Sequence, residues 1–567
     1  MKTNRVAFIL LGTVAFLGGT ATASMAQVIS TTEAEDFGEG VIFLESEPDT
    51  IPDAQPIDTQ PAEPAEPTEA QPTFVEPVFP EDLLREDGIF LEDDPVEDDI
   101  FLDDDVVDDA PTDLPETVIE PPAESTDDTA TETPSYVERF NAGVEFYREG
   151  NDEAAIAEFN LAIDLNAAYA PAYLFRGAAF ARLENTSAAL NSYNQAISID
   201  PTYSVAYLNR GILYYDLQNS QRALDDLNQA IATEPTLATA TSSTAATAYI
   251  YRGLIASEQG NQQTALEDLN EAVRLDPNNA FAYFHRGLIF KALNNLELAV
   301  SDFTQAITLQ EDYTEAYLNR GVAHYRLGST TAALNDFNQA IALDNTNVEA
   351  YYNRSFVLMA QGRPQAALAD LNQVISLEPG YASAYLVRGQ VYAASGNSAS
   401  AISDFSRMLE LSPGSAEAHY RRGSAYLLLN DQQAAIADFT AALALDPGHA
   451  PSYKGRGDAF ANLGDGFSAI GDYSTALDLE PTYWDAYSSR GRTHYENGNY
   501  QEAYADFSRV IAADVFDPDA FYYRGITNAL LGNTGGAEAD LEKAGSLYLT
   551  NNEAERYRIV LDALRKL

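Results

Sequence analysis

The sequence predicts an all-α protein, a solenoid of about twelve stacked helix pairs, from three observations. The pattern Ala-Tyr-x-x-Arg-Gly recurs, with small variation, along most of the 567-residue chain. Its copies are 34 residues apart at every step but one, where the interval is 42. Each unit contains two stretches with apolar residues at helical spacing. A constant period of this length is typical of one supersecondary unit that is copied many times and buries its apolar faces against its neighbours.

The copies of the pattern define eleven units, and stepping back 34 residues from the first copy reaches a degenerate twelfth unit at Gly143. In the next unit, Tyr173, Gly177 and Phe180 share one helical face, and a second apolar stripe follows. The copies end at Gly177, Gly211, Gly253, Gly287, Gly321, Ser355, Gly389, Gly423, Gly457, Gly491 and Gly525.

Residues 1–26 are predicted to be a signal peptide. Lys2 and Arg5 precede an apolar stretch, and Ser24-Met25-Ala26 forms the expected cleavage site. The apolar stretch is shorter than the roughly 20 residues that a spanning helix needs, which favours cleavage over a retained anchor. The mature chain is therefore expected to be exported, periplasmic or secreted in a bacterium, without membrane insertion.

Residues 27–134 are predicted to be a disordered acidic, Pro-rich region. They carry 35 of the 87 acidic residues, 15 of the 26 prolines and one base, Arg85. Such a segment cannot bury enough apolar surface to offset the conformational entropy that folding removes. Three near copies of one triplet interrupt it: Ile42-Phe43-Leu44, Ile89-Phe90-Leu91 and Ile100-Phe101-Leu102. These are either docking motifs for a partner or duplicated low-complexity sequence.

The repeat array is expected to span residues 135–550. The long interval contains an insertion at 238–245, of Ala, Thr and Ser only, which lengthens either a loop or a helix. Residues 551–567 depart from the repeat, with Tyr557 and Val560 at helical spacing and charged residues opposite. They are predicted to form a terminal capping helix over the last apolar face.

The period and the order of small and aromatic residues resemble the tetratricopeptide repeat. The third unit shows this order in Tyr207, Gly211, Tyr214, Ala223, Leu227, Ala230 and Pro235. The resemblance covers Ser135 to about Leu549. It implies a right-handed superhelix of about twelve helix pairs with a concave groove, and a role in binding peptides or assembling complexes.

The arginine of the pattern recurs from Arg176 to Arg524, and in ten units an aspartate follows sixteen residues later. The exception is Ser192, which follows Arg176. A row of arginines suggests anion binding, but repeated Arg–Asp combinations are better explained as internal ion pairs. Each arginine could pair with the acidic residue of its own unit, or the acidic residue could pair with the arginine of the following unit. In the second scheme Glu158 would pair with Arg176. Both schemes give ten pairs, so the sequence leaves them open.

The resemblance places the residue after the pattern's aromatic on the concave surface. The expected apolar and aromatic groove residues at this position are Leu208, Ile250, Phe284, Leu318, Tyr352, Leu386 and Tyr420. One residue later come Asn209, Asn319 and Asn353, expected to bond the backbone of an extended peptide, while Tyr215 and Tyr325 add contact area. Ordinary packing between units stays open as the alternative for each. Only Lys454 places a lysine at this position, so a clamp for a terminal carboxylate is not expected.

Composition disfavours other classes of function. The net charge of −55 opposes binding to nucleic acid and to anionic lipid. Cysteine is absent, and the five histidines fall in separate units, so neither metal sites nor catalytic residues nor cofactors are expected.

The sequence therefore predicts a non-enzymatic, exported scaffold that binds other proteins or peptides in a groove. A periplasmic chaperone-like holdase and an accessory subunit of an envelope enzyme complex remain alternatives, and self-association stays open.

Overall fold

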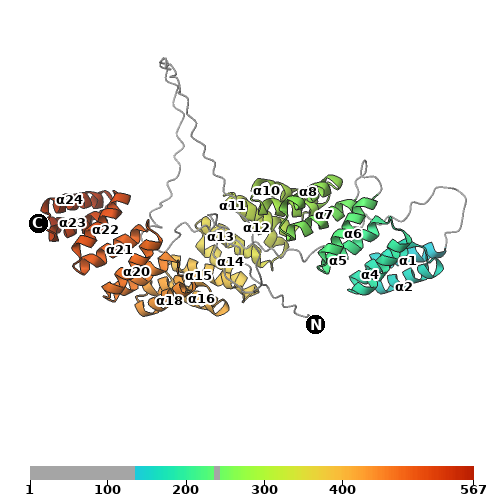
Figure 1. Cartoon of the computed structure of the whole chain (residues 1–567), viewed down its shortest axis with the longest axis horizontal. Coiled ribbons are helices and arrows are strands. Elements are labelled where there is room, and N and C mark those ends of the chain that lie inside the picture. Colours follow the sequence, from blue (N-terminus) through green and yellow to red (C-terminus); the bar gives the residue numbers. More distant parts are fainter. Residues whose placement is uncertain (1–134, 235–242) are drawn as a thin grey trace, which may run out of the picture. The chain divides into compact units, whose positions relative to one another are not determined.

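The computed structural model describes residues 135–234 and 243–567 (Figure 1). Within these ranges all regular secondary structure is helical, in 25 helices that pack in chain order, each against its neighbours. The predicted all-α solenoid of helix pairs is confirmed. The predicted signal peptide and acidic region lie outside the described residues.

Each unit consists of a first helix, with an odd number, and a second helix, with an even number. The first helices are α1 (Ser135–Arg148), α3 (Ala170–Arg182), α5 (Ser204–Asp216), α7 (Ser243–Glu258), α9 (Ala280–Ala292), α11 (Thr314–Arg326), α13 (Val348–Ala360), α15 (Ala382–Ala394), α17 (Ala416–Leu428), α19 (Ala450–Asn462), α21 (Trp484–Glu496) and α23 (Pro518–Leu530). The second helices are α2 (Asp152–Leu165), α4 (Thr186–Ile199), α6 (Ser220–Thr233), α8 (Gln262–Leu275), α10 (Leu296–Leu309), α12 (Thr330–Leu343), α14 (Pro364–Leu377), α16 (Ser398–Leu411), α18 (Gln432–Leu445), α20 (Gly466–Leu479), α22 (Tyr500–Ala513) and α24 (Thr534–Thr550). The chain ends with α25 (Ala554–Leu564).

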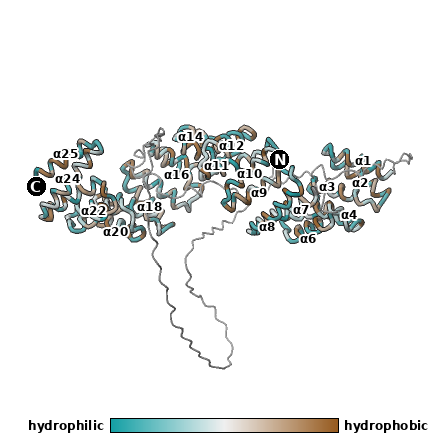
Figure 2. Tube along the Cα trace, turned by 90° about the horizontal axis from the view of Figure 1, so that it is seen from above, coloured by the Kyte–Doolittle hydropathy of each residue, from teal (hydrophilic) through white to brown (hydrophobic). Residues whose placement is uncertain are grey.

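Local sequence explains where the helices end and begin. Gly328 follows α11 at φ 74°, a left-handed conformation that suits glycine, and its N–H donates to the Tyr325 carbonyl at 2.8 Å. The side chain of Asn185 accepts a hydrogen bond from the Ala188 N–H and caps α4. Figure 2 shows hydrophobic and hydrophilic residues alternating along the helices, as expected for helices with one buried face.

The two helices of a unit approach closely at the glycine of the pattern. A Cβ placed on Gly321 would lie 2.7 Å from Cε1 of Phe337, closer than real Cβ atoms approach. Phe337 is 1% exposed, so its ring fills the space that the missing side chain leaves. The glycine of α11 is therefore required by the aromatic ring of α12.

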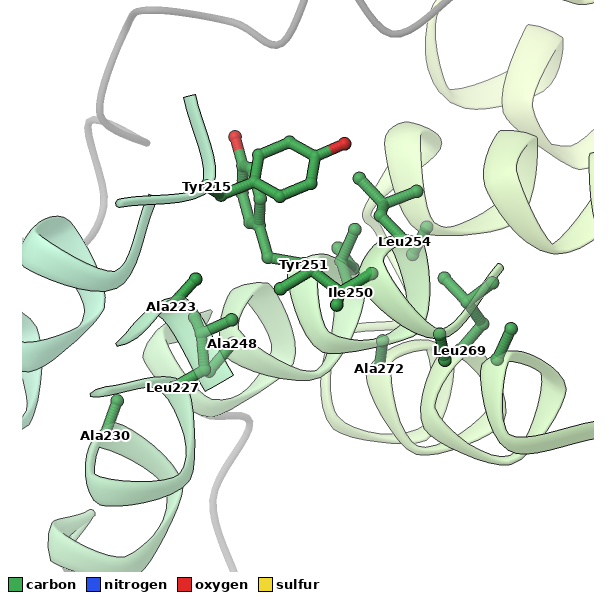
Figure 3. Packing of buried hydrophobic residues seen from close by; sticks show 14 of the residues in the cluster. Tyr215, Ala223, Leu227, Ala230, Ala248, Ile250, Tyr251, Leu254, Leu269 and Ala272 are labelled. Carbon is green, nitrogen blue, oxygen red and sulfur yellow. The ribbon is translucent and has the colours of Figure 1, made fainter. Parts of the chain in front are cut away.

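The long interval does not interrupt the core. Helix α7 begins at Ser243 and is three residues longer than its neighbours α5 and α9, so the end of the insertion lengthens a helix. Figure 3 shows Tyr215 of α5 beside Tyr251 of α7, with ring centroids 5.4 Å apart. Leu227 of α6 belongs to the same buried cluster, so one core continues across the insertion.

Consecutive units also contact one another through their first helices. Consecutive first helices, from α1 and α3 to α21 and α23, are in close contact at every step except between α13 and α15. No two consecutive second helices in the described part of the chain are in comparably close contact. We call the surface on which the first helices lie side by side the inner face. It consists of the solvent-exposed side chains of the first helices.

The last helix closes the array. Val560 of α25 is fully buried in a cluster that includes Leu541 and Tyr548 of α24. Thus α25 covers the apolar face that a further unit would otherwise cover. Of the helices in the described ranges, none combines the length and the hydrophobicity that crossing a bilayer requires.

Candidate peptide-binding surface

The arginine of the pattern forms a bidentate ion pair within its own unit. In α15, Nε of Arg388 donates to Oδ2 of Asp404 at 2.8 Å, and Nη2 donates to Oδ1 at 2.7 Å. The structure thereby decides between the two schemes that the sequence leaves open. The same pairing with the aspartate sixteen residues later occurs at Arg210, Arg252, Arg286, Arg320, Arg354, Arg388, Arg422, Arg456, Arg490 and Arg524.

The third nitrogen of each arginine reaches back to the preceding unit. Nη1 of Arg388 donates to Oδ1 of Asn372 at 2.7 Å, so one side chain links α15, α16 and α14. The hydrogen bond with Asp404 raises the pKa of Arg388, against the opposing effect of burial. These arginines serve packing between units, and the internal ion-pair interpretation is confirmed. Glu158, a candidate partner of Arg176, pairs instead with Arg139 at 3.2 Å.

Most of the predicted groove residues are buried, which corrects the expectation that they line an open surface. Leu208, Ile250, Phe284 and Tyr352 are at most 2% exposed. Leu386 and Tyr215 are 8% exposed. Leu318, Tyr325 and Tyr420 are partly buried and pack against core clusters. A peptide on the surface does not reach the fully buried side chains, so ordinary packing, the open alternative, describes their contacts.

The predicted asparagines bond within their own helices. Nδ2 of Asn209, Asn319 and Asn353 each donates to the carbonyl four residues earlier, at 2.8, 2.9 and 3.0 Å. Oδ1 of Asn319 also accepts from Nζ of Lys291 at 2.6 Å. Their exposed fractions are 4 to 7%. The hydrogen bonds expected for a peptide backbone are thus directed to the protein's own helices, and a role in peptide binding stays a prediction.

Further residues of the inner face lie two turns along the first helices, at a position that the sequence analysis named only in two other units, through Tyr215 and Tyr325. Three consecutive units carry only apolar residues there: Met359 and Ala360 in α13, Ala393 and Ala394 in α15, Leu427 and Leu428 in α17. We call these six residues the apolar strip. Ala360, Ala394 and Leu428 are exposed, and Leu428 retains 45% of its surface. Tyr325-Arg326 and Ala461-Asn462 occupy the same positions in the units on either side.

A signal in the sequence distinguishes the two sets of positions. The position after the aromatic is apolar or aromatic in nearly every unit, which is typical of a core. The positions of the apolar strip hold Tyr-Asp, Ser-Glu, Lys-Ala, Tyr-Arg and Leu-Leu in different units, so the residue type there varies from unit to unit.

The histidines and Lys454 have structural partners. His285 is 5% exposed beside Phe281, and burial lowers its pKa to about 3, so it is neutral. Nδ1 of His419 lies 3.0 Å from Oδ1 of Asp438, the partner of Arg422. Nζ of Lys454 lies 3.0 Å from Asp458. Among the described residues, no three side chains of His, Asp or Glu gather as metal ligands do.

Comparison with known proteins gives two matching family profiles. The profile described as "Tetratricopeptide repeat" matches residues 356–416, 395–450, 454–518 and 489–546. The profile described as "TPR repeat" matches residues 177–218, 253–294, 287–328 and 325–362. The matches extend from α3 to α24. No curated protein matches the sequence.

Several solved structures are similar to parts of the chain. The MamA protein is 24% identical over 30% of this chain and 92% of its own, with a TM-score of 0.29. YrrB, a TPR protein with an unusual peptide-binding site, is 24% identical over 33% of this chain and 96% of its own, with a TM-score of 0.30. Yeast Tom70 is 16% identical over 76% of this chain and 96% of its own, with a TM-score of 0.32.

Proposed function

The chain belongs to the tetratricopeptide repeat proteins, and on this premise we propose that it is an exported scaffold that holds polypeptide partners against its inner face. The fold is typical of protein–protein interaction, and proteins of this family are generally scaffolds without catalytic activity. The proposal therefore assigns binding to this chain and no chemical step.

The observation that carries the proposal is the apolar strip. Its six residues occur at intervals of 34 on three neighbouring first helices, so they follow one another along the inner face. None of the six residues is charged, whereas other units have charged residues at the same positions, such as Arg326, Glu258 and Glu496. An accessible apolar surface rimmed by polar residues favours contact with another polypeptide.

Charge supports a protein partner over the other common partners. The chain has 87 acidic and 32 basic residues, and ten of the eleven arginines of the pattern are already paired with aspartates. Nucleic acid and anionic lipid need clusters of unpaired basic residues.

Export is part of the proposal and rests on residues 1–26. A positive N-terminus, an apolar stretch and small residues before Gln27 are the features that a secretory machinery recognises. Expression in a bacterium with separation of the cytoplasm and periplasm tests this part. We expect the protein in the periplasm or the medium, starting at Gln27, and a cytoplasmic protein that starts at Met1 would disprove it.

A pair of matched variants tests the binding surface. Leu428 and Leu445 are each the last residue of a helix and are 45% and 47% exposed, but only Leu428 lies on the inner face. Peptides that bind the mature protein are first selected from a random library. Their affinities for the Leu428→Asp and Leu445→Asp variants are then measured. We expect Leu428→Asp to weaken binding on the order of tenfold or more. The variant lacks the leucine side chain that a bound peptide would cover, and it places a charge in the contact.

The control variant should bind as the unchanged protein does. Equal binding by both variants, with helix content retained, would remove the inner face from the proposal. Selection of many unrelated apolar sequences would favour the holdase alternative, whereas one shared motif would favour the scaffold.

A further inference from the structure

One junction in the described part of the array lacks a contact that its other junctions have. The first helices α13 and α15 are the only consecutive pair of first helices there that are not in close contact. Helix α14 also packs less closely on α15 than most second helices pack on the first helix that follows them. The unit of α13 and α14 is therefore held less tightly to the unit of α15 and α16 than most neighbouring units are held.

The residue at the glycine position of α13 explains this looser packing. Ser355 stands where the pattern has glycine, is fully buried, and donates from its Oγ to the Tyr352 carbonyl at 2.6 Å. Its facing residue in α14 is Leu371, and α23 and α24 have the same arrangement with a glycine. A Cβ on Gly525 would lie 2.9 Å from Cγ of Leu541, so a side chain at this position requires the two helices to move apart. Accordingly, α13 and α14 are the least closely packed pair within any unit of the described residues.

The second helix α14 transmits this separation to α15. Nη1 of Arg388 in α15 donates to Oδ1 of Asn372 in α14 at 2.7 Å, so the two helices are joined. Val387 and Val391 of α15 are buried in the same cluster as Leu371 of α14. A first helix that is seated on α14 moves away from α13 when α14 does, and the contact between the two first helices is lost. The contacts between α14 and α15 are thus placed to act as a pivot.

On the inner face, specific contacts join the first helices at several other junctions. They connect the residue four positions after the glycine of the pattern with the residue two positions before the next such glycine. The contacting pairs are Tyr147–Phe175, Tyr215–Tyr251 (Figure 3), Lys291–Asn319 and Tyr495–Tyr523. The same two positions at the junction of α13 and α15 hold Met359 and Val387. Methionine is unbranched and has three rotatable bonds, so it can adapt to more than one spacing between the helices.

We propose that this junction is a hinge of the array, which sets the distance between the α13 and α15 parts of the apolar strip. Met359 and Ala360 lie on one side of the hinge, and Ala393 and Ala394 lie on the other. The two units stay joined through α14 while the first helices change their separation on the inner face. Because few direct contacts break in this movement, it costs less free energy here than at a closely packed junction.

The position of the hinge gives it a role in binding. A polypeptide that lies across the apolar strip touches both sides of the hinge, and its apolar contacts favour one separation of α13 and α15 over the others. The hinge therefore lets the strip adjust to the width of its partner. This consequence rests on the proposed function, whereas the hinge itself does not.

Spin labels on the mature protein test the hinge, because the chain contains no cysteine and new cysteines are labelled alone. Gln365→Cys and Ala399→Cys place labels on the exposed second residues of α14 and α16, on either side of the hinge. Glu297→Cys and Thr331→Cys, at the same positions of α10 and α12, are the matched control, because α9 and α11 are in close contact. Electron spin resonance measures the distribution of distances within each pair. We expect the distribution of the hinge pair to be about twice as wide as that of the control pair.

The variant Ser355→Gly restores the pattern and lets α14 approach α13. It should narrow the distribution of the hinge pair to the width of the control pair, and far-UV circular dichroism shows whether each variant is folded. Equal widths of the two pairs in the free protein would overturn the proposal. A folded Ser355→Gly variant that keeps the wider distribution would overturn it as well.

Peptides selected against the mature protein give a second measurement. A bound peptide should narrow the distribution of the hinge pair and leave that of the control pair unchanged. A bound peptide that leaves the hinge pair as wide as in the free protein would show that the hinge does not act on the apolar strip. The free protein decides whether the hinge exists and Leu428→Asp decides whether the inner face binds, so the two proposals can fail separately.

Discussion

The junctions between units and the inner face follow opposite rules. At each junction an arginine that is paired within its own unit also bonds to the preceding unit, with nearly the same geometry each time. Arg354 and Arg388 are examples: both pair with their aspartates at 2.7 Å, and both donate to an asparagine of the preceding unit at 2.7 Å. On the inner face the accessible positions change from Tyr325-Arg326 to Leu427-Leu428 within three units. Residues that repeat in every unit hold the units together, and residues that vary are free to define what is bound.

The largest effect is expected from breaking one ion pair of a junction. Asp404→Ala leaves Arg388, whose side chain is 17% exposed, without its carboxylate. Removal of one partner of a largely buried pair should cost about 3 kcal/mol. Because each unit depends on its neighbours, hydrogen exchange in α15 and α16 is the measurement.

Glu410→Ala is the control for this prediction. Glu410 pairs with Arg407 in solvent, where such pairs contribute at most about 1 kcal/mol. If Asp404→Ala were as mild as Glu410→Ala, the junction pairs would have no special role in stability.

A second pair of variants compares two glycines inside helices. Gly321→Ala puts a Cβ 2.7 Å from Cε1 of Phe337 and should destabilise the protein by about 2 kcal/mol through overpacking. Gly471→Ala meets no atom within 4 Å and should stabilise it by up to about 1 kcal/mol, because alanine is the better helix former. Denaturant unfolding measures the change in the free energy of unfolding for each variant. Changes of the same sign in both variants would contradict the prediction.

A third prediction concerns pH at a buried position. His285 has a pKa of about 3 in the folded protein and about 6.5 when unfolded. The neutral side chain therefore stabilises the fold fully above pH 6.5, and this contribution is lost as the pH falls towards 3.

The comparison is with His285→Leu, which does not titrate. Between pH 7 and pH 5, the unchanged protein should lose about 1 to 2 kcal/mol relative to this variant. Parallel curves of unfolding free energy against pH would show that His285 remains accessible to protons.

The smallest effect is expected from completing the row of junction pairs. Nε of Arg176 donates to Oγ of Ser192 at 3.2 Å, and burial lowers the pKa of this arginine. Ser192→Asp restores the residue found in the other units and should stabilise α3 and α4 by about 0.5 to 1 kcal/mol. Hydrogen exchange in these two helices measures it, and weaker protection would indicate that the site cannot hold the pair.

Particular residues show how far the sequence could be interpreted. The 34-residue period predicts the units and the close contact at Gly321, because a solenoid repeats its packing with its sequence. The same regularity predicts that each arginine pairs with an aspartate, but not which unit supplies the aspartate, since Arg388 lies near the second helices of two units. The position after the aromatic was assigned to the surface by resemblance, and Tyr352, fully buried, shows that here it belongs to the core.

The sequence by itself determined the all-α class, the number of units and the residues at their junctions, because these depend on contacts that recur at a constant separation along the chain. Only the tertiary structure decided which face of each first helix is accessible, because a residue's burial depends on helices that lie 16 to 34 positions away and on how closely they approach. It also decided that Trp484, Ala513 and Arg509 line one surface cavity, since no period along the chain describes the proximity of these three residues.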